Sequence, residues 1–125
     1  MVPDAWYPGY PNASSKAMVK EYVAKYGGTA SDVNADVAEA YSVGQVTAEA
    51  VKATGGTAGS KIISYLHSGV TLASVQGPVK FNSLGETVKA IAVVFQWQDG
   101  KFVQVLPVGA AGSVKIMNPK PAWSG

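Results

Sequence analysis

The sequence predicts an α/β fold in which helices come first and strand hairpins follow. The spacing of apolar residues is helical in the first half of the chain and changes to a period of two after residue 69. Glycine or a capping residue stands wherever one of these elements should start or stop. Of the 125 residues, 47% are hydrophobic and 14% charged, yet no apolar run approaches the roughly 20 residues that span a bilayer.

Three helices are predicted, each with its own start and stop signals. A surface helix over about 13–26 carries its apolar residues on one face and ends at Gly27-Gly28. A second helix over about 35–54 is apolar on nearly every side, which predicts that it is buried in a larger body. A short third helix over 61–68 follows. The expected N-caps are Asn12 or Ser14, then a residue within Asp32–Asn34, and finally Ser60.

Short strands are predicted in the second half of the chain. Residues 70–81 indicate a strand and a turn into another short strand. The strongest strand runs from Val88 to Trp97, and Asp99-Gly100 predicts a hairpin into a returning strand over Lys101–Leu106. The tail over 109–125 is expected to be peripheral. These strands are too few for a closed sheet, so the apolar second helix needs partners that this chain lacks.

Composition argues against several classes of function. The net charge is +2 and every basic residue is lysine, so the fork that arginine offers to phosphate is missing and nucleic acid is not expected as a partner. The absence of cysteine excludes disulfides, thiolate catalysis and cysteine-ligated metals. His67 is the only histidine, and one histidine cannot form a metal site alone. Residues 1–4 lack the regions of a signal peptide, so the start is expected to be mature, trimmed or truncated.

No catalytic arrangement is predicted. Asp32 and Asp36 stand at a helix start, where capping explains them, and no Gly-x-Ser-x-Gly elbow occurs. No cofactor is expected, because the glycine pairs do not stand between a strand and a helix in the phosphate-binding order. Five aromatic residues could line a pocket, although such residues more often belong to a core: Tyr7, Tyr10, Tyr41, Phe95 and Trp97.

Four strings resemble branched-chain amino acid binding proteins, a family of type I periplasmic solute-binding proteins. The string Val94–Lys101 resembles the family's terminal hinge region, and Gly77–Gly85 resembles its G-P-x-x-F-D-x-x-G segment. The string Ala38–Ser42 is similar to the buried A-Y-D-A helix, and Tyr22–Gly27 to the end of the preceding helix. Two family aspartates are replaced here, by Asn82 and Ser42.

The resemblance implies a partial type I periplasmic-binding-protein fold with parts of both lobes and the final hinge crossover. Residues 1–33 would form a lobe-two segment, residues 34–95 a lobe-one segment, and residues 96–125 the crossover and the lobe-two tail. The crossover itself would be Phe95-Gln96-Trp97. The missing partners of the apolar second helix would then lie in the earlier two-thirds of a longer protein.

The function that this resemblance implies is the substrate-binding component of an ABC transporter, or a fragment of it. It would be periplasmic or at the cell surface, bind an amino acid or related solute between its lobes, and present it to a permease. Asn34 and Asp36 are the expected ligand-binding positions, with Tyr41 as a third that also fits a core. Two alternatives are a small enzyme, which the missing nucleophile motifs argue against, and a self-associating α/β interaction domain. The isolated chain is expected to associate with itself.

Overall fold

Two compact units make up the chain, and each is described by itself. The computed structural model describes residues 2–88, 93–110 and 112–119. One unit spans Trp6–Ile91, and the other joins Met1–Ala5 with Ala92–Gly125. The chain is therefore mixed α/β, as predicted.

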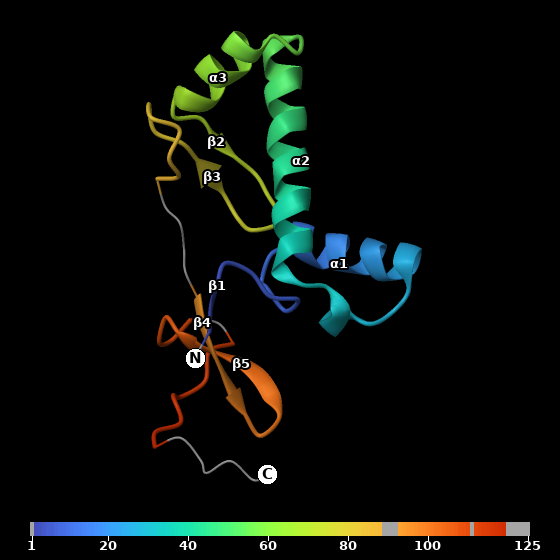
Figure 1. The fold of residues 1–125 in the computed structure, drawn as a ribbon, viewed down its shortest axis with the longest axis vertical. Helices are drawn as coiled ribbons and strands as arrows, with labels where there is room; N and C mark the ends of the chain where they lie inside the picture. The colour runs from blue at the N-terminus through green and yellow to red at the C-terminus, as the bar shows by residue number, and fades with distance from the viewer. Residues whose placement is uncertain (1, 89–92, 111, 120–125) are drawn as a thin grey trace. The chain divides into compact units, whose positions relative to one another are not determined.

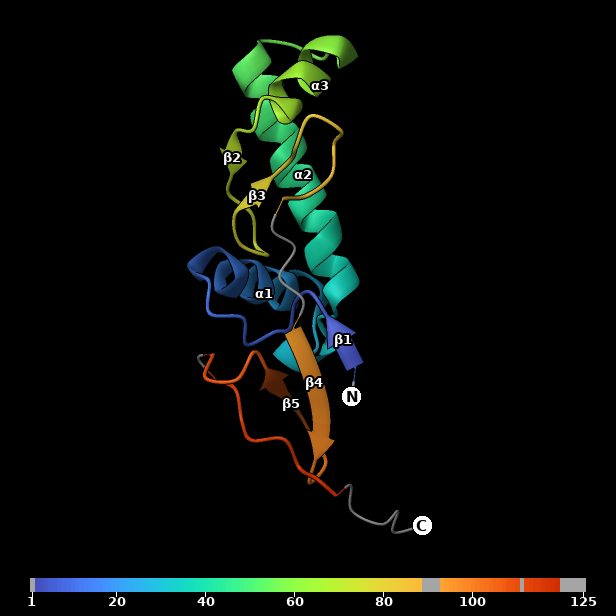
Figure 2. The same cartoon turned by 90° about the vertical axis from the view of Figure 1, so that its left-hand side faces the viewer.

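The unit Trp6–Ile91 contains three helices, α1 (Ala13–Tyr26), α2 (Ala35–Thr54) and α3 (Gly59–His67). Figures 1 and 2 show α1 crossing one end of α2, while α3 folds back beside the other end. The predicted bounds of the first two helices are confirmed.

Side-chain caps fix where the two longer helices begin. The Asn12 Oδ1 atom accepts hydrogen bonds from the backbone nitrogens of Ser14 at 2.8 Å and Ser15 at 3.4 Å. The Asn34 Oδ1 atom accepts one from Val37 N at 3.1 Å. These bonds satisfy amides that have no partner within the helix, which is why a short polar residue marks each start.

The prediction that Ser60 caps the third helix is wrong. The helix begins at Gly59, and its N-cap is Ala58, which makes no side-chain capping bond. The Ala58 carbonyl accepts from Lys61 N at 3.0 Å and Ile62 N at 3.1 Å, so the helix starts two residues earlier and Ser60 lies inside its first turn. At the other end, the Ser68 hydroxyl donates to the Tyr65 carbonyl at 2.7 Å.

Asp32 caps a different element from the one predicted. It ends a short 3-10 helix over Ala30–Asp32, and its Oδ2 atom accepts from Thr29 N at 2.7 Å and Thr29 Oγ1 at 2.8 Å. The backbone hydrogen bond from Thr29, and then the one from its hydroxyl, lower the pKa of Asp32. The aspartate therefore orders the connection between α1 and α2.

A small antiparallel hairpin completes this unit. It pairs β2 (Thr71–Leu72) with β3 (Val79–Lys80), and an isolated bridge between Phe81 and Thr87 extends it. In both Figure 1 and Figure 2 the hairpin lies beside α2. The strand and turn predicted over 70–81 are confirmed.

One core holds residues 6–12, which we call the first segment, together with α1, α2 and residues 73–78, which we call the hairpin loop. Its buried members are Trp6, Met18, Val19, Val33, Ala38 and Val75. The indole nitrogen of Trp6 donates to Ser15 Oγ at 2.8 Å inside this core. The expected lobe boundary between residues 33 and 34 falls within this core, and the assignment of segments to lobes stays a prediction.

Gln45 ties the hairpin loop to the two long helices. Its Oε1 atom accepts from the buried Val75 N at 2.9 Å, and its Nε2 atom donates to Ser14 Oγ at 3.4 Å. Asn12 Nδ2 adds a bond to the Ser74 carbonyl at 3.1 Å. A polar residue in the middle of α2 thus satisfies a buried loop amide that would otherwise lack a partner.

Helix α2 lacks the further partners that its apolar sequence predicts in a larger body, so most of its sides are open in this chain. Only Ala38, Ser42 and Ala50 are buried, whereas Tyr41 is 43% and Val43 66% exposed. The two neighbouring helices and the hairpin cover a single stripe of α2, because this unit contains no larger sheet among its described residues.

The Ser42→Ala substitution should stabilise the protein. Ser42 is 5% exposed, and its hydroxyl is buried without a hydrogen-bond partner among the described residues. Removing an unsatisfied hydroxyl recovers its desolvation cost, so we expect the free energy of unfolding to rise by about 1 kcal/mol. Chemical denaturation followed by circular dichroism measures this, and Ser31→Ala on the exposed surface is the control. A loss of stability in Ser42→Ala would mean that the hydroxyl has a partner.

The second unit is a three-stranded sheet in the order β1-β4-β5, with all pairs antiparallel. Its strands are β1 (Val2–Asp4), β4 (Val93–Gln98) and β5 (Lys101–Leu106). The predicted hairpin at Asp99-Gly100 is confirmed: both residues have positive φ, 49° and 72°, as a tight hairpin turn requires.

Part of the long predicted strand is confirmed and part lies outside the described residues. Residues 93–98 are a strand, Val88 is in a bend, and residues 89–92 are not described. The pairing of β1 with β4 was not predicted. Among the residues that the structure describes, no helix has both the length and the apolar character needed to cross a membrane.

Candidate functional site

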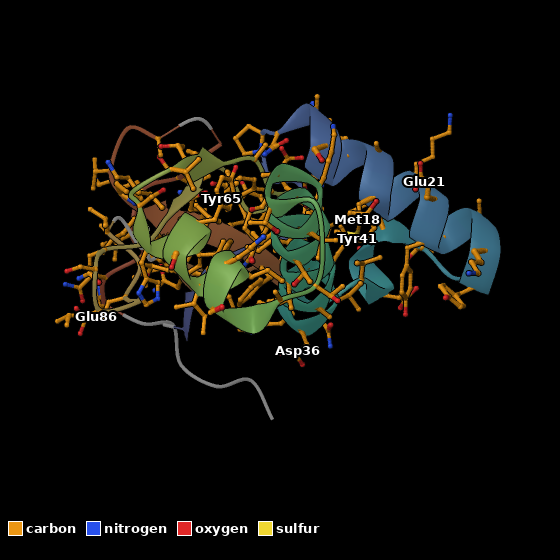
Figure 3. All side chains as sticks on the ribbon, turned by 90° about the horizontal axis from the view of Figure 1, so that it is seen from above. Met18, Glu21, Asp36, Tyr41, Tyr65 and Glu86 are labelled. Carbon is orange, nitrogen blue, oxygen red and sulfur yellow. The ribbon has the colours of Figure 1, made fainter. Side chains whose placement is uncertain are left out.

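A groove lies between α1 and α2 in the unit Trp6–Ile91. It has a volume of about 420 Å³, and we call it the α1–α2 groove. Figure 3 shows Met18 of α1 and Tyr41 of α2 close together between the two helices. The lining residues are Met18, Glu21, Tyr22, Lys25, Tyr26, Val37, Ala40 and Tyr41.

Aromatic rings and one cation define the chemistry of this groove. The rings of Tyr22 and Tyr26 lie 4.8 Å apart at an interplanar angle of 48°. The Lys25 Nζ atom lies 5.3 Å from the centre of the Tyr26 ring, a cation–π distance. The groove can accept an apolar or aromatic body, because tyrosine rings and the side chains of Met18, Val37 and Ala40 line most of it.

The sequence placed the residues of this groove in a buried stripe instead. The spacing of Met18, Val19, Tyr22, Val23 and Tyr26 predicted one buried helix face, and Met18 and Val19 are indeed buried while Val23 is half-buried. Of the three that line the groove, Met18, Tyr22 and Tyr26, the second is half-buried and the third is 66% exposed. Their common spacing of four was the available signal, because residues four apart lie on the same side of a helix. It could not show that the face is open.

The three predicted ligand-binding residues do not form one cluster. Asn34 caps α2, and its Nδ2 atom lies 3.5 Å from Asp36 Oδ2 in the first turn. Figure 3 shows Asp36 and Tyr41 on different sides of α2. Only Tyr41 lines the α1–α2 groove. The ligand-binding role of all three stays a prediction.

The predicted crossover residues lie on the two faces of β4. Phe95 is buried and stacks on Phe102, with ring centres 4.6 Å apart. Trp97 is 65% exposed, and its ring lies 5.2 Å from Phe102. The Gln96 side chain instead bonds to the backbone of Met117. The role of these three residues as the crossover stays a prediction.

The five aromatic residues considered for a pocket are dispersed. Tyr7 and Tyr10 form an edge-to-face pair at 6.0 Å in the first segment of their unit. Burial, and then the neighbouring Tyr10, raise the pKa of Tyr7. Tyr41 belongs to the α1–α2 groove, whereas Phe95 and Trp97 lie in the other compact unit.

His67 takes a packing position at the end of α3. It is half-buried, and its Nε2 atom lies 3.0 Å from where a Cβ on Gly85 would stand. Within the described ranges, no group of three or more histidine, aspartate or glutamate side chains is placed to hold a metal ion. The imidazole therefore packs α3 against the turn over 82–85.

Replacing Gly85 by alanine should destabilise this contact. Gly85 has φ +82°, and an added methyl group would meet His67. We expect the free energy of unfolding to fall by about 1–2 kcal/mol from the left-handed backbone alone, and to fall further because of the clash with His67. Gly55→Ala, where φ is +69° and nothing lies within 4 Å, is the matched control for strain. The difference between the two variants in chemical denaturation should vanish in a His67→Ala background, and a difference that survives would exclude the clash.

Comparison with known proteins agrees with this fold. Residues 1–101 match the sequence profile of the family described as periplasmic binding protein, so the chain belongs to that family. A comparison with curated protein sequences gives no match.

Three solved structures share the fold. A leucine-binding protein, LivK, from Thermotoga maritima superposes with a TM-score of 0.66 at 21% identity, covering 82% of this chain and 28% of that chain. A solute-binding protein of an ABC transporter from R. palustris, in complex with benzoate, gives 0.65 at 23% identity with the same coverage. Another from Rhodopseudomonas palustris BisB5, with 3,4-dihydroxybenzoic acid, gives 0.61 at 22% identity, covering 80% of this chain and 27% of that chain.

This chain therefore spans a little over a quarter of the length of those proteins. The family match and these superpositions confirm the predicted partial type I periplasmic-binding-protein fold. The branched-chain specificity expected from the sequence is not established, because two of the three structures hold aromatic acids.

Proposed function

We propose that this chain is part of the substrate-binding component of an ABC transporter, located in the periplasm or at the cell surface. The complete protein would bind a small organic carboxylate, such as an amino acid, between two α/β lobes and present it to a permease. The family match over residues 1–101 is the observation that carries this proposal. No enzymatic activity is proposed.

The ligand class rests on the ligands with which the similar structures are named. Leucine, benzoate and 3,4-dihydroxybenzoic acid are each named with one of them, and all three combine a carboxylate with an apolar body. This chain has no arginine, so any carboxylate contact from it would come from lysine, a hydroxyl, a side-chain amide or a backbone amide. We propose that the start of α2, at Asn34 and Asp36, and Tyr41 lie nearest the solute.

The shared core favours a lobe division different from the one expected at residues 33 and 34. Residues of the first segment, α1, α2 and the hairpin loop pack together, so they would move as one body. We propose that Trp6–Ile91 belongs to a single lobe, and that the lobes are joined near the bounds of the two compact units.

Calorimetry on the protein from the complete reading frame tests this function. We expect leucine or benzoate to bind at least about tenfold more tightly than leucinamide or benzamide, because the amides lack the charge. Absence of binding to every acid would contradict the solute-binding proposal. Equal binding of acid and amide would contradict the carboxylate class alone.

Two variants in the same assay test the proposed positions. Asp36→Asn should weaken the binding of leucine about tenfold, since the carboxylate can pair only with the solute's amino group, and Tyr41→Phe should weaken the binding of either acid by the same factor, or about 1.4 kcal/mol. His67→Ala, at the last residue of α3, should leave the affinity unchanged. An unchanged affinity in both test variants would remove these residues from the site.

A self-associating interaction domain is the second candidate. Exposed large apolar side chains favour it, since monomeric proteins rarely leave extended apolar surface open. Those more than half exposed are Tyr26, Val43, Ile63, Leu84, Trp97 and Val108. Under the solute-binding proposal the same surface would make the isolated chain associate, so association alone does not distinguish the two. Binding of a small carboxylate by the complete protein would distinguish them, because only the solute-binding proposal predicts it.

A further inference from the structure

Two glutamine side chains hold the C-terminal segment onto the sheet of the second unit. Gln96 and Gln98 are two residues apart on β4, so their side chains project from the same face of the strand. Phe95 and Trp97 point to the opposite face, where they contact Phe102. The polar face of β4 is therefore available for another segment.

The segment that occupies it is residues 113–118, which we call the C-terminal strap. The Gln96 Nε2 atom donates to the Met117 carbonyl at 2.9 Å, and the Gln96 Oε1 atom accepts from Met117 N, also at 2.9 Å. One amide side chain thus pairs with both backbone groups of a single residue, as a neighbouring strand would. The carbonyl needs a donor and the amide an acceptor, so this pairing also fixes the orientation of the Gln96 amide.

Gln98 strengthens this pairing. Its Nε2 atom donates to the Gln96 Oε1 atom at 2.8 Å and to the Lys115 carbonyl at 2.9 Å. The first bond holds the Gln96 amide in place, and the second attaches the strap at a second residue. Both Gln96 and Gln98 are half-buried, which keeps water from competing fully for these bonds.

A third attachment lies on β5. Val114 N donates to the Gln104 carbonyl at 2.8 Å. In the order β1-β4-β5, β5 is an edge strand, and an edge presents unpaired backbone groups. The strap therefore starts at a carbonyl of the edge strand and reaches the polar face of β4, so one segment is bonded to both strands of the hairpin.

We propose that Gln96 and Gln98 form a side-chain clamp that adds the C-terminal strap to the sheet, with Gln96 as its positioning residue. The Gln96 side chain is bonded to the strap, and Gln96 pairs with Val103 of β5 in the sheet, so the residue is held on two sides. The clamp makes the second half of β4 a rigid part of its unit rather than a point of bending. This inference stands on contacts within one unit and does not depend on solute binding.

The Gln96→Glu substitution tests the clamp because its effect should depend on pH. Above the ordinary glutamate pKa of about 4.3, the introduced carboxylate can still accept from Met117 N but cannot donate to the Met117 carbonyl. Below that pKa, the protonated carboxyl has one donor and one acceptor in nearly the geometry of the amide. We expect protection of the Met117 amide against hydrogen exchange to fall about tenfold at pH 7 and to recover near pH 3.5.

The measurement is amide exchange by NMR on the 125-residue chain, expressed at each pH relative to the unsubstituted protein. Gln76→Glu, a half-buried glutamine in the other unit, is the matched charge control and should leave the strap unchanged. Gln98→Leu should lower Met117 protection at all pH values, because it cannot regain a donor. In every variant the hairpin amide of Val103, which pairs with Gln96, should stay protected.

Three results would overturn the proposal. The first is unchanged protection of the Met117 amide in Gln96→Glu at pH 7, and the second is a loss of that protection that does not recover at low pH. The third is a loss of protection at the Val103 amide equal to the loss at Met117, in both the Gln96 and the Gln98 variants. The last would show that the strap has no separate attachment to the hairpin.

Discussion

Trp6→Ala should cost the protein about 3–5 kcal/mol of its free energy of unfolding, the range for a large aromatic residue removed from a core. Trp6 is 1% exposed, and it joins the first segment to α1 through the bond from its indole nitrogen to Ser15 Oγ. The substitution leaves a cavity and also deprives a buried hydroxyl of its donor. Denaturation followed by circular dichroism at 222 nm measures this without relying on tryptophan fluorescence.

Trp97→Ala is the matched control, because it removes the same side chain from a position that is 65% exposed. We expect this control to lose roughly 1 kcal/mol or less, from its contact with Phe102. Trp6→Phe should fall between the two, since it keeps most of the volume but not the hydrogen bond. Equal losses at both tryptophans would contradict the core described for the unit Trp6–Ile91.

Phe95→Ala should have a comparable effect, about 3–5 kcal/mol, in the other unit. Phe95 is 1% exposed and stacks on Phe102 at an interplanar angle of 14°. Amide exchange should show lost protection in the β4–β5 hairpin and unchanged protection in α2, because the two lie in different compact units. Phe102→Ala, at a position 38% exposed, should cost less. A parallel loss in α2 would show that the two units unfold together.

Local signals explain why the helix bounds and the main hairpin could be predicted. Asn12 and Asn34 cap helices through bonds to residues two or three positions away, so the information lies within the motif itself. The turn at Asp99-Gly100 likewise needs only two residues that tolerate positive φ. The failure at Ser60 has the opposite cause: the N-cap is Ala58, whose methyl side chain makes no capping bond and therefore leaves no signal in the sequence.

Contacts between distant residues were missed. Strand β1 pairs with β4 across about ninety residues, and its short, proline-containing sequence only argued against a helix. The C-terminal strap shows no strand pattern in the sequence. Most of its bonds come from glutamine side chains of β4, and such bonds require no alternation of apolar residues in the strap. The α1–α2 groove was read as a buried face, since spacing shows which residues share a face but not what covers them.

The most direct test of the central claim, that this chain carries part of a two-lobed solute-binding protein, uses the 125-residue chain alone. Calorimetry with leucine and benzoate, run beside sedimentation on the same sample, measures binding and association together. The account predicts no saturable binding of either acid and a sample that associates through the exposed faces of α2 and the hairpin. A monodisperse monomer that binds either acid with micromolar affinity would contradict it, because the 125 residues would then form a complete site.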